Sequence, residues 1–379
     1  MKKLILPLIL LQLFCGCSKN SSQKSDNYIQ IASPVEIGVD TLILNEMTTN
    51  ISEQVYPNIH SILIAKNGKL FYEKYFDGKD QNWGSDLGVV VHNDTTLHDL
   101  RSITKSIVSA CIGIAIQEGL INNVHEKVSK FFPEYSFDDK KKDWTIEHFL
   151  TMTTGLSWNE NLPYNNPEND EIKMVYSDDP VKYVLDKPLE NIPGTRFNYN
   201  GGATQVLAEI IERASGYDIE QFAEKYLFKP LGIKKIEWNR YSRWNKSILK
   251  DKFGAASGLR LTSEDLLKFA VLYRNNGKWN GKQILLAGWV KESFAKKIEF
   301  PSSVAEGNDA YGYQFWIWSD STRNRRFNIV SAIGNGDQHI YWDIDNDLIV
   351  ISTAGNYNQW GIKNDSYALL KYYIYSLFD

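Results

Sequence analysis

The chain has 379 residues, of which 43% are hydrophobic and 23% are charged, and its formal net charge is −4. This composition is typical of an ordinary globular protein with one large or two interlocked domains, and it argues against a disordered chain. Only three cysteines are present and Lys+Arg (42) fall below Asp+Glu (46), so neither a disulfide scaffold nor a nucleic-acid partner is expected.

The first 16 residues are predicted to be a signal peptide. Two lysines precede an apolar run from Leu4 to Phe14, which is too short to span a bilayer. Gly16 before Cys17 is similar to a bacterial lipobox, in which the cysteine is lipidated and becomes the new N-terminus. We therefore expect a protein that a lipid on Cys17 anchors in the bacterial cell envelope, on the periplasmic side or in the outer membrane. Cleavage nearby and release of a soluble protein is the alternative.

Residues 17–35 are rich in polar residues and are predicted to form a flexible tether, so that residues 36–379 form the folded domain. A helix is expected over residues 38–55. Two alternating runs then follow, at residues 61–65 and 70–75, separated by Asn67-Gly68. Asn-Gly between such runs is the strongest short-range signal for a β-hairpin.

Residues 102–118 form a nearly uniformly apolar segment with Gly119 as a stop. A helix that is apolar all round is buried on all sides, which places it between layers or lobes. Cys111 within it is expected to be a small core residue. Further helices are predicted at residues 145–152, 203–214, 219–227, 263–275 and 367–377.

Strand signals return late in the chain, at residues 312–318, 327–332, 339–343 and 348–353. Strands at both ends with helices between them predict an α+β fold, in which an antiparallel sheet is flanked by helices and joined to a mainly helical lobe. The sheet lobe would comprise about residues 36–100 and 306–379, and the helical lobe about residues 101–305.

Common metal and hydrolase motifs are absent. There is no H-E-x-x-H zinc motif and no G-x-S-x-G elbow. The six histidines show no ligand spacing, so each is expected to be structural or on the surface, and neither a metal nor an organic cofactor is predicted. They are His60, His92, His98, His125, His148 and His339.

The motif S-x-x-K occurs four times, beginning at Ser21, Ser102, Ser247 and Ser293. Only Ser102 opens the buried apolar helix, where the first-turn N–H groups and the helix dipole favour a developing negative charge. Lys105 lies three residues further on, on the same helical face.

A plain helix cap is the competing interpretation of Ser102. A capping box, however, requires Glu or Gln at position 105. A lysine in the first turn of a buried helix opposes the dipole and resists burial, and such a lysine often serves as a base or a charge partner. The pair Ser102 and Lys105 is therefore predicted to be catalytic.

Five ordered blocks carry a resemblance to a known family. The chain resembles the serine β-lactamase-related hydrolases from about residue 59 to its end, nearest the branch of class C β-lactamases, D-Ala-D-Ala peptidases and family VIII esterases. The blocks are RSITKSIVSACIGIAIQEGLI (101–121), WTIEHFLTMTTGLSW (144–158), PGTRFNYNGGATQVLAEIIERASG (193–216), GAASGLRLTSEDLLKFA (254–270) and YGYQFWIW (311–318).

The resemblance implies a role for two further positions. The family's second motif, Y-x-N, reads Tyr199-Asn200-Gly201 here, which implies that Tyr199 is a general base. The asparagine position is glycine, and Asn200 is the alternative source of the missing amide. A packing role for Tyr199 is the plain alternative.

The third motif, a basic residue and a hydroxyl residue before glycine, aligns with Ala332-Ile333-Gly334. Gly334 would allow close backbone approach, and the N–H of Asn335 would form an oxyanion hole with that of Ser102. The basic and hydroxyl side chains are missing, so the protein looks poorly equipped to bind penicillins.

The resemblance implies an acyl-enzyme mechanism. Ser102 would attack an ester or amide carbonyl while Tyr199, its ionised form favoured by cationic Lys105, takes the serine proton. A small-molecule esterase or amidase is the first function expected. The alternatives are a peptidase or β-lactamase acting on cell-wall-type, peptide-like substrates, and a non-catalytic binding protein that retains the fold.

Overall fold

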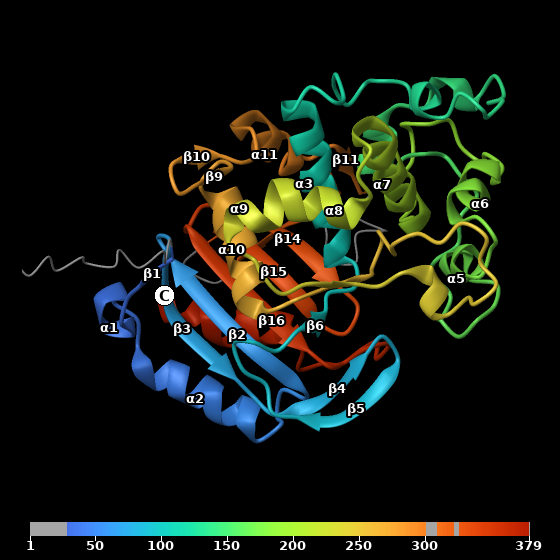
Figure 1. The fold of residues 1–379 in the computed structure, drawn as a ribbon. Helices are drawn as coiled ribbons and strands as arrows, with labels where there is room; N and C mark the ends of the chain where they lie inside the picture. The colour runs from blue at the N-terminus through green and yellow to red at the C-terminus, as the bar shows by residue number, and fades with distance from the viewer. Residues whose placement is uncertain (1–28, 301–308, 322–325, 379) are drawn as a thin grey trace, which may run out of the picture.

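The computed structural model describes residues 29–300, 309–321 and 326–378 (Figure 1). The predicted signal peptide and Cys17 lie outside these residues. The strands are β1 (Gln30–Ile31), β2 (Ile59–Lys66), β3 (Lys69–Tyr75), β4 (Gly78–Asn82), β5 (Ser85–Val90), β6 (His98–Asp99), β7 (Glu237–Trp238), β8 (Leu259–Leu261), β9 (Lys278–Trp279), β10 (Lys282–Gln283), β11 (Ile298–Glu299), β12 (Ala310–Tyr311), β13 (Trp316–Ser321), β14 (Arg326–Gly334), β15 (Gln338–Asp343) and β16 (Leu348–Ala354).

The helices divide into a larger α-helical set and a few tighter or wider turns. The α-helices are α1 (Pro34–Ile37), α2 (Thr41–Ser52), α3 (Ile103–Gln117), α4 (Ile146–Leu150), α5 (Asp170–Val175), α6 (Pro180–Asp186), α7 (Gly201–Ser215), α8 (Ile219–Ala223), α9 (Lys229–Leu231), α10 (Ser263–Arg274), α11 (Ala287–Ser293) and α12 (Ser366–Leu369). The 3-10 segments are η1 (Val128–Phe131), η2 (Lys141–Asp143), η4 (Tyr241–Arg243) and η6 (Tyr375–Phe378), and the π-helical segments are η3 (Glu224–Phe228) and η5 (Leu370–Ile374).

Nine of the described strands form one sheet in the order β1-β3-β2-β16-β15-β14-β13-β12-β11. Every neighbouring pair is antiparallel except β1 and β3, which are parallel. The sheet joins the two ends of the chain, as the sequence predicted for an α+β fold. Three smaller sheets, β4-β5, β6-β8-β7 and β9-β10, lie outside it.

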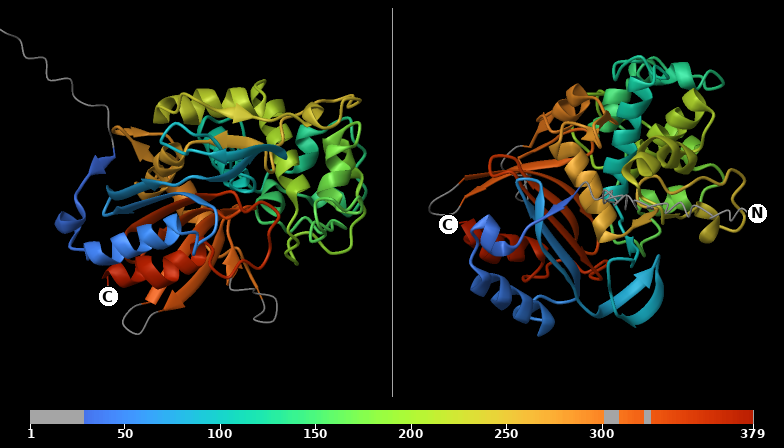
Figure 2. Two further views of the ribbon diagram at one scale, coloured as in Figure 1. Left: turned by 90° about the horizontal axis from the view of Figure 1, so that it is seen from below. Right: turned by 60° about the vertical axis from the view of Figure 1, so that its left-hand side comes forward.

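The sheet is covered on both faces. The helix α2 and the helical run from α12 to η6 lie side by side on one face (Figure 2). On the other face, α10 packs against β2, β15 and β16, and α3 packs against β14 and β15. Consecutive residues of β2 alternate between the two cores, with Ile62 and Ile64 in one and Leu63 and Ala65 in the other. This double burial explains why residues 62–65 are a continuous apolar run and not the alternating run that the sequence analysis described.

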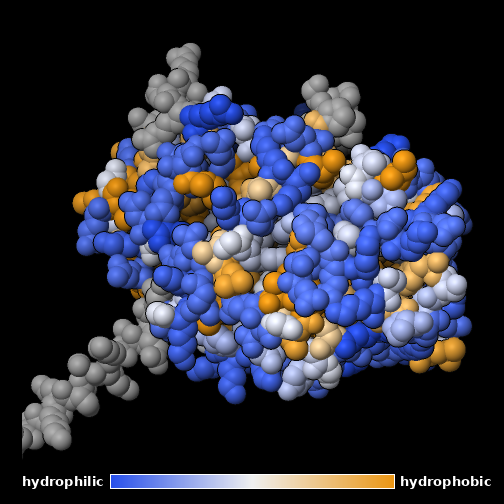
Figure 3. All heavy atoms as spheres, turned by 90° about the horizontal axis from the view of Figure 1, so that it is seen from above, coloured by the Kyte–Doolittle hydropathy of each residue, from blue (hydrophilic) through white to orange (hydrophobic). Residues whose placement is uncertain are grey.

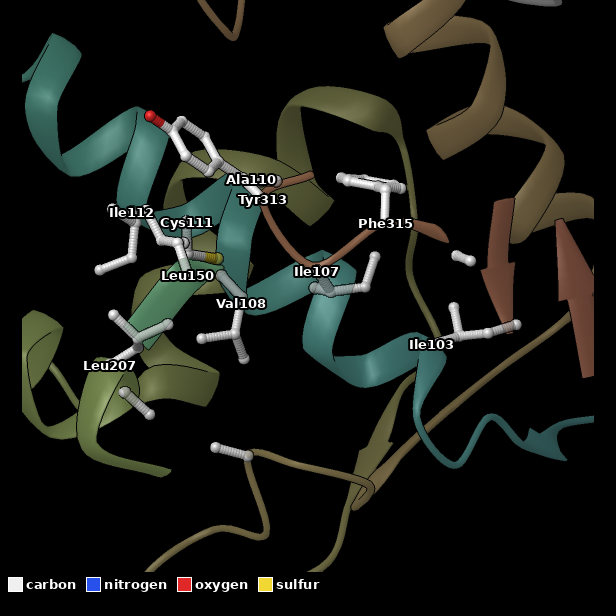
Figure 4. Close-up of a cluster of buried hydrophobic side chains, with 14 of the residues drawn as sticks. Ile103, Ile107, Val108, Ala110, Cys111, Ile112, Leu150, Leu207, Tyr313 and Phe315 are labelled. Atoms are coloured by element: carbon white, nitrogen blue, oxygen red, sulfur yellow. The ribbon is translucent and has the colours of Figure 1, made fainter. Parts of the chain in front are cut away.

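Several predicted elements are confirmed. β2 and β3 form the expected hairpin, and Asn67 (φ 52°) and Gly68 (φ 75°) take the left-handed conformations that a tight hairpin turn requires. In α3 every residue from 103 to 115 is buried, and the chain turns away at Gly119 with φ 72°. Figure 4 shows Cys111 among the apolar side chains of this helix and its neighbours.

Other predictions are corrected. Residues 29–35 are not tether, because Gln30 pairs with Lys69 along the sheet edge and Ser33 caps α1. The strand predicted at 312–318 begins only at Trp316, because residues 312–315 form the turn between β12 and β13. A Cβ on Gly312 in this turn would overlap the carbonyl oxygen of Ser293. The sheet also extends to β11, before the predicted boundary at residue 306, and α10 from the predicted helical lobe packs on the sheet.

The surface of the described part is mixed. The face drawn in Figure 3 is hydrophilic over most of its area, and its hydrophobic residues form small separate groups. None of the helices in the described ranges has both the length and the apolar character that crossing a bilayer would require.

Candidate active site

Ser102 stands at the N-terminus of α3, directly after Arg101, whose φ of 50° is unusual for a residue with a side chain. The side chain of Ser102 makes no capping hydrogen bond to the helix. The competing interpretation of Ser102 as a plain cap is therefore not supported, and its hydroxyl is available to other groups.

The Nζ of Lys105 forms hydrogen bonds to two segments of the chain that meet at the site. Its Nζ donates to the Oγ of Ser102 at 3.0 Å and to the carbonyl oxygen of Ala256 at 2.9 Å. The residue is only 1% exposed. A buried ammonium is costly unless it is hydrogen-bonded, so these two acceptors explain how the first turn of α3 tolerates a lysine.

Tyr199 completes the group that the sequence predicted. The Lys105 Nζ lies 4.9 Å from the centroid of its ring, and its phenol lies close enough to Ser102 for that side chain to influence its pKa. The ring stacks on Trp316 with the centroids 5.5 Å apart. Burial, and then the charge of Glu160, raise the pKa of Tyr199 well above its ordinary value. The expectation that the ionised phenol is favoured is therefore wrong for the free protein, in which the phenol is neutral.

Two carboxyl groups that the sequence analysis missed lie beside this group. The Oε2 of Glu160 accepts from the backbone N–H of Gly201 at 2.6 Å and from the indole of Trp158 at 2.8 Å. Glu171, on α5, accepts from the hydroxyl of Ser257 at 3.1 Å. Burial, and then the charge of Glu171, raise the pKa of Glu160 to about 8, while the charge of Lys105 opposes the rise. Near neutral pH the Glu160 carboxyl therefore holds a proton.

Gly201 explains why a carboxyl can lie here. A Cβ at this position would stand 3.1 Å from the Oε2 of Glu160 and 3.2 Å from the Cβ of Ala256. Glu160 thus occupies the space into which the side chain of the family's Y-x-N asparagine would extend. The glycine in Tyr199-Asn200-Gly201 was the only signal in the sequence for this exchange.

Asn200 does not supply the missing amide to this group. Its Oδ1 accepts from the N–H of Ala203 at 3.0 Å and so caps α7. Its Nδ2 is buried without a hydrogen-bond partner among the described residues. The shift by one residue along the chain turns this side chain toward its own helix.

Gly334 and Asn335 lie where the sequence analysis expected close approach. Gly334 ends β14, and a Cβ on it would overlap the carbonyl oxygen of Leu100. The side chain of Asn335 pairs with Asn358, whose backbone N–H donates to its Oδ1 at 2.7 Å. Within the described residues no protein acceptor takes up the backbone N–H of Ser102 or of Asn335. Both N–H groups are therefore available to a ligand.

Ser102 and Asn335 open onto a cleft of about 260 Å³. Aromatic, aliphatic, glycine and polar residues line it, and Glu171 is the acidic residue among them. The guanidinium of Arg101 lies 4.1 Å from the ring centroid of Trp83, and Trp83 packs against Trp244 at 5.0 Å. The aromatic residues that line the cleft are Trp83, Tyr164, Tyr176, Tyr241 and Trp244.

The fold agrees with the comparisons to known proteins. The sequence matches the Beta-lactamase family over residues 60–369, and the chain belongs to this family. A solved structure of EstCE1, described as a hydrolase with promiscuous acyltransferase activity, has a TM-score of 0.66 at 16% identity, covering 85% of this chain and 96% of that one. The resemblance read from the sequence is confirmed.

The matches to curated relatives cover a smaller share of both chains than this structural match does. A candidate D-alanyl-D-alanine carboxypeptidase of Escherichia coli is 27% identical over 63% of this chain and 56% of its own length. The 6-aminohexanoate-dimer hydrolase of Paenarthrobacter ureafaciens is 26% identical over 68% of this chain and 66% of its own length. The chain spans about half the length of the first curated relatives that it matches.

Proposed function

We propose that the protein is a serine hydrolase that cleaves ester or amide bonds through an acyl-enzyme on Ser102. The observation that carries this proposal is the 3.0 Å hydrogen bond from the Lys105 Nζ to a Ser102 Oγ that does not cap its helix. A serine hydroxyl that accepts a hydrogen bond from a positioned amine and has a phenol nearby is arranged as nucleophilic catalysis needs.

Because the phenol of Tyr199 is neutral, it accepts the Ser102 proton only as it gives up its own. As the Ser102 Oγ forms its bond to the substrate carbonyl carbon, its proton passes to the Tyr199 oxygen, and the phenol proton passes to the departing alcohol or amine. The Lys105 ammonium stabilises the negative charge that develops on the Ser102 oxygen. Water then attacks the acyl group, and the same relay runs in reverse, returning a proton to Ser102.

The oxyanion is held by backbone groups in this proposal. The free N–H groups of Ser102 and Asn335 would donate to the carbonyl oxygen as it becomes negative. Gly334 supports this arrangement because a larger residue would push the strand away from the turn at Leu100. Loss of one such donor typically costs about 10²–10³-fold in rate.

The cleft favours small esters and amides with an apolar acyl group. Its aromatic residues offer apolar contact, and the family's third-motif basic residue, which would bind a carboxylate, is Ala332 here. Two similar proteins support this class: one is named 6-aminohexanoate-dimer hydrolase, and the other, EstCE1, is described as a hydrolase with promiscuous acyltransferase activity. A D-alanyl-D-alanine peptidase is the second candidate, because the Escherichia coli relative carries that name.

A substrate panel tests the proposal. Nitrophenyl esters of increasing acyl length, D-amino-acid amides, D-alanyl-D-alanine peptides and nitrocefin are compared on wild type and Ser102→Ala. We expect turnover of the esters or amides by wild type and its loss in the variant. Release of D-alanine at a higher kcat/KM than ester hydrolysis would favour the second candidate. No turnover of any substrate and no labelling by a fluorophosphonate would favour a binding protein.

We also propose that a lipid on Cys17 holds the enzyme at the bacterial cell envelope. The support is the Gly16-Cys17 pair after the short apolar run. Mass spectrometry of the mature protein should find an N-terminal lipidated Cys17, and Cys17→Ala should leave the protein without lipid. A mature wild type with an N-terminus beyond Cys17 would contradict the proposal.

A further inference from the structure

Three histidines and an aspartate, far apart in the sequence, meet in one buried cluster outside the catalytic group. His60 comes from β2, Asp80 from β4, His92 from the segment after β5, and His98 from β6. One ligand atom of each lies within 4.8 Å of one of every other. Each residue is at most 5% exposed. The histidines show no ligand spacing along the chain, and it is the fold that brings them together.

The rings of His60 and His92 each use one nitrogen on a backbone carbonyl. His60 Nε2 lies 3.1 Å from the carbonyl oxygen of Lys79, and His92 Nδ1 lies 2.9 Å from that of Phe76. A carbonyl can only accept, so each of these nitrogens carries the hydrogen. In a neutral imidazole the other nitrogen then holds a lone pair. This use of the outer nitrogen on a backbone acceptor is the arrangement found in metal-binding histidines.

The remaining ring nitrogens, which face the middle of the cluster, have weak hydrogen-bond partners or none in the described part of the chain. His60 Nδ1 and His98 Nδ1 are buried without a hydrogen-bond partner, while His98 Nε2 lies 3.4 Å from the hydroxyl of Thr353. His92 Nε2 lies 3.4 Å from Asp80 Oδ2. Buried polar atoms are rarely left unpaired, so two in one cluster require an explanation.

The surroundings fit the rings closely. A Cβ on Gly78 or on Gly355 would stand 2.8 Å from an atom of the His60 ring, so both positions need glycine while this ring is in place.

We propose that His60, Asp80, His92 and His98 bind one structural Zn²⁺ ion. Three imidazoles and one carboxylate fill the four positions of a closed tetrahedral site, the type that stabilises a fold rather than one that activates water. Imidazole ligands suit Zn²⁺, whereas Mg²⁺ and Ca²⁺ prefer oxygen. This site departs from the sequence expectation of no metal.

The zinc joins four segments close to the catalytic group. It ties the β4-β5 hairpin and the segment from His92 to His98 to the central sheet through β2. His98 is followed by Asp99, which pairs with Arg101 at 3.3 Å immediately before Ser102. The Asp80 Oδ1 also accepts from the phenol of Tyr357 at 3.4 Å. The ion therefore fixes the polypeptide that leads into the turn of Ser102.

Metal content of the full-length protein, purified without a histidine tag, tests this proposal. Elemental mass spectrometry should find about one zinc per chain in wild type. His98→Gln should lower this at least about tenfold, whereas His125→Gln, which changes an exposed histidine outside the cluster, should retain it. Zinc in His98→Gln at the wild-type level, or another metal in its place, would overturn the assignment.

A second measurement does not depend on any variant folding. Wild type is treated with a strong chelator, and Zn²⁺ is then added back. Removal should lower Tm by on the order of 5 °C, and one equivalent of Zn²⁺ should restore it. Less than about 0.1 zinc per chain in wild type grown with zinc, together with no change in Tm on its addition, would refute the site. Neither readout depends on hydrolytic activity, so the proposed function stands or fails separately.

Discussion

The Oε2 of Glu160 accepts a 2.6 Å hydrogen bond from the backbone N–H of Gly201, at the position where the family's second motif has asparagine. A buried carboxyl therefore stands beside Lys105 in place of a neutral amide. Gly201 and Glu160 form a matched pair, since the glycine leaves the space and the glutamate fills it.

The pairing predicts strong coupling between the two positions. Gly201→Asn alone should lower both Tm and kcat/KM, because its side chain meets the Glu160 carboxylate 3.1 Å from the Cβ. Glu160→Ala should restore part of both losses in the double variant. A double-mutant cycle measured by urea unfolding should give a coupling of about 1–3 kcal/mol. Additive effects would show that the two residues do not compete for one space.

Glu160 also predicts a pH dependence of stability. Its folded pKa is raised above the unfolded value, so the folded protein holds a proton that the unfolded chain has lost between about pH 4.5 and 8. The free energy of unfolding should therefore fall as pH rises through this window, with a slope of at most about 1.4 kcal/mol per pH unit from this group. Glu160→Gln should remove that slope in urea unfolding measured from pH 5 to 9.

Glu118→Gln is the control for this measurement, because it changes an exposed glutamate at the end of α3 and should leave the slope unchanged. A wild-type slope that persists in Glu160→Gln would assign the titration to another group.

Replacing Lys105 should affect activity much more than stability. Lys105→Met should lower kcat/KM by at least about 10²-fold, since the charge beside Ser102 is lost. The free energy of unfolding should change little, because burying an ammonium is itself costly and methionine fills a similar volume. Lys141→Met removes a second buried lysine, whose Nζ donates to Leu185, and should leave kcat/KM unchanged. Equal losses in the two variants would contradict a direct role for Lys105.

The close contact between Gly334 and Leu100 leads to a prediction about the backbone beside the cleft, which has no space for a side chain at position 334. Gly334→Ala should force the strand away from Leu100, which costs about 1–3 kcal/mol and lowers kcat by about 10²-fold as the Asn335 N–H is displaced. Gly288→Ala, in the open on α11, should leave kcat unchanged and hold or raise Tm. Full activity in Gly334→Ala would remove Asn335 from the proposed oxyanion hole.

The sequence predicted the local elements and the local part of the site. Ser102 and Lys105 are one helical turn apart, so their contact follows from helix geometry, and Asn67-Gly68 specifies its hairpin without help from the rest of the chain. Tyr199 was found only through the resemblance to a family, since one tyrosine among 21 carries no signal of its own.

Groups that meet through tertiary structure could not be predicted. Glu160 and the histidine cluster each depend on segments that only the completed fold brings together. The predicted charge state of Tyr199 was wrong for the same reason. Burial and the charge of Glu160 raise the pKa of its phenol, and neither could be foreseen from the sequence. Even the end of the predicted tether, near Gln30, is ordered by an edge strand that has little hydrophobic pattern.

Mass spectrometry of the intact protein after reaction with a fluorophosphonate tests the central claim most directly. Wild type should gain the mass of one adduct, located by peptide mapping at Ser102, and Ser102→Ala should gain none while it keeps the wild-type Tm. An adduct on another residue, or equal labelling of the two proteins, would contradict Ser102 as the nucleophile.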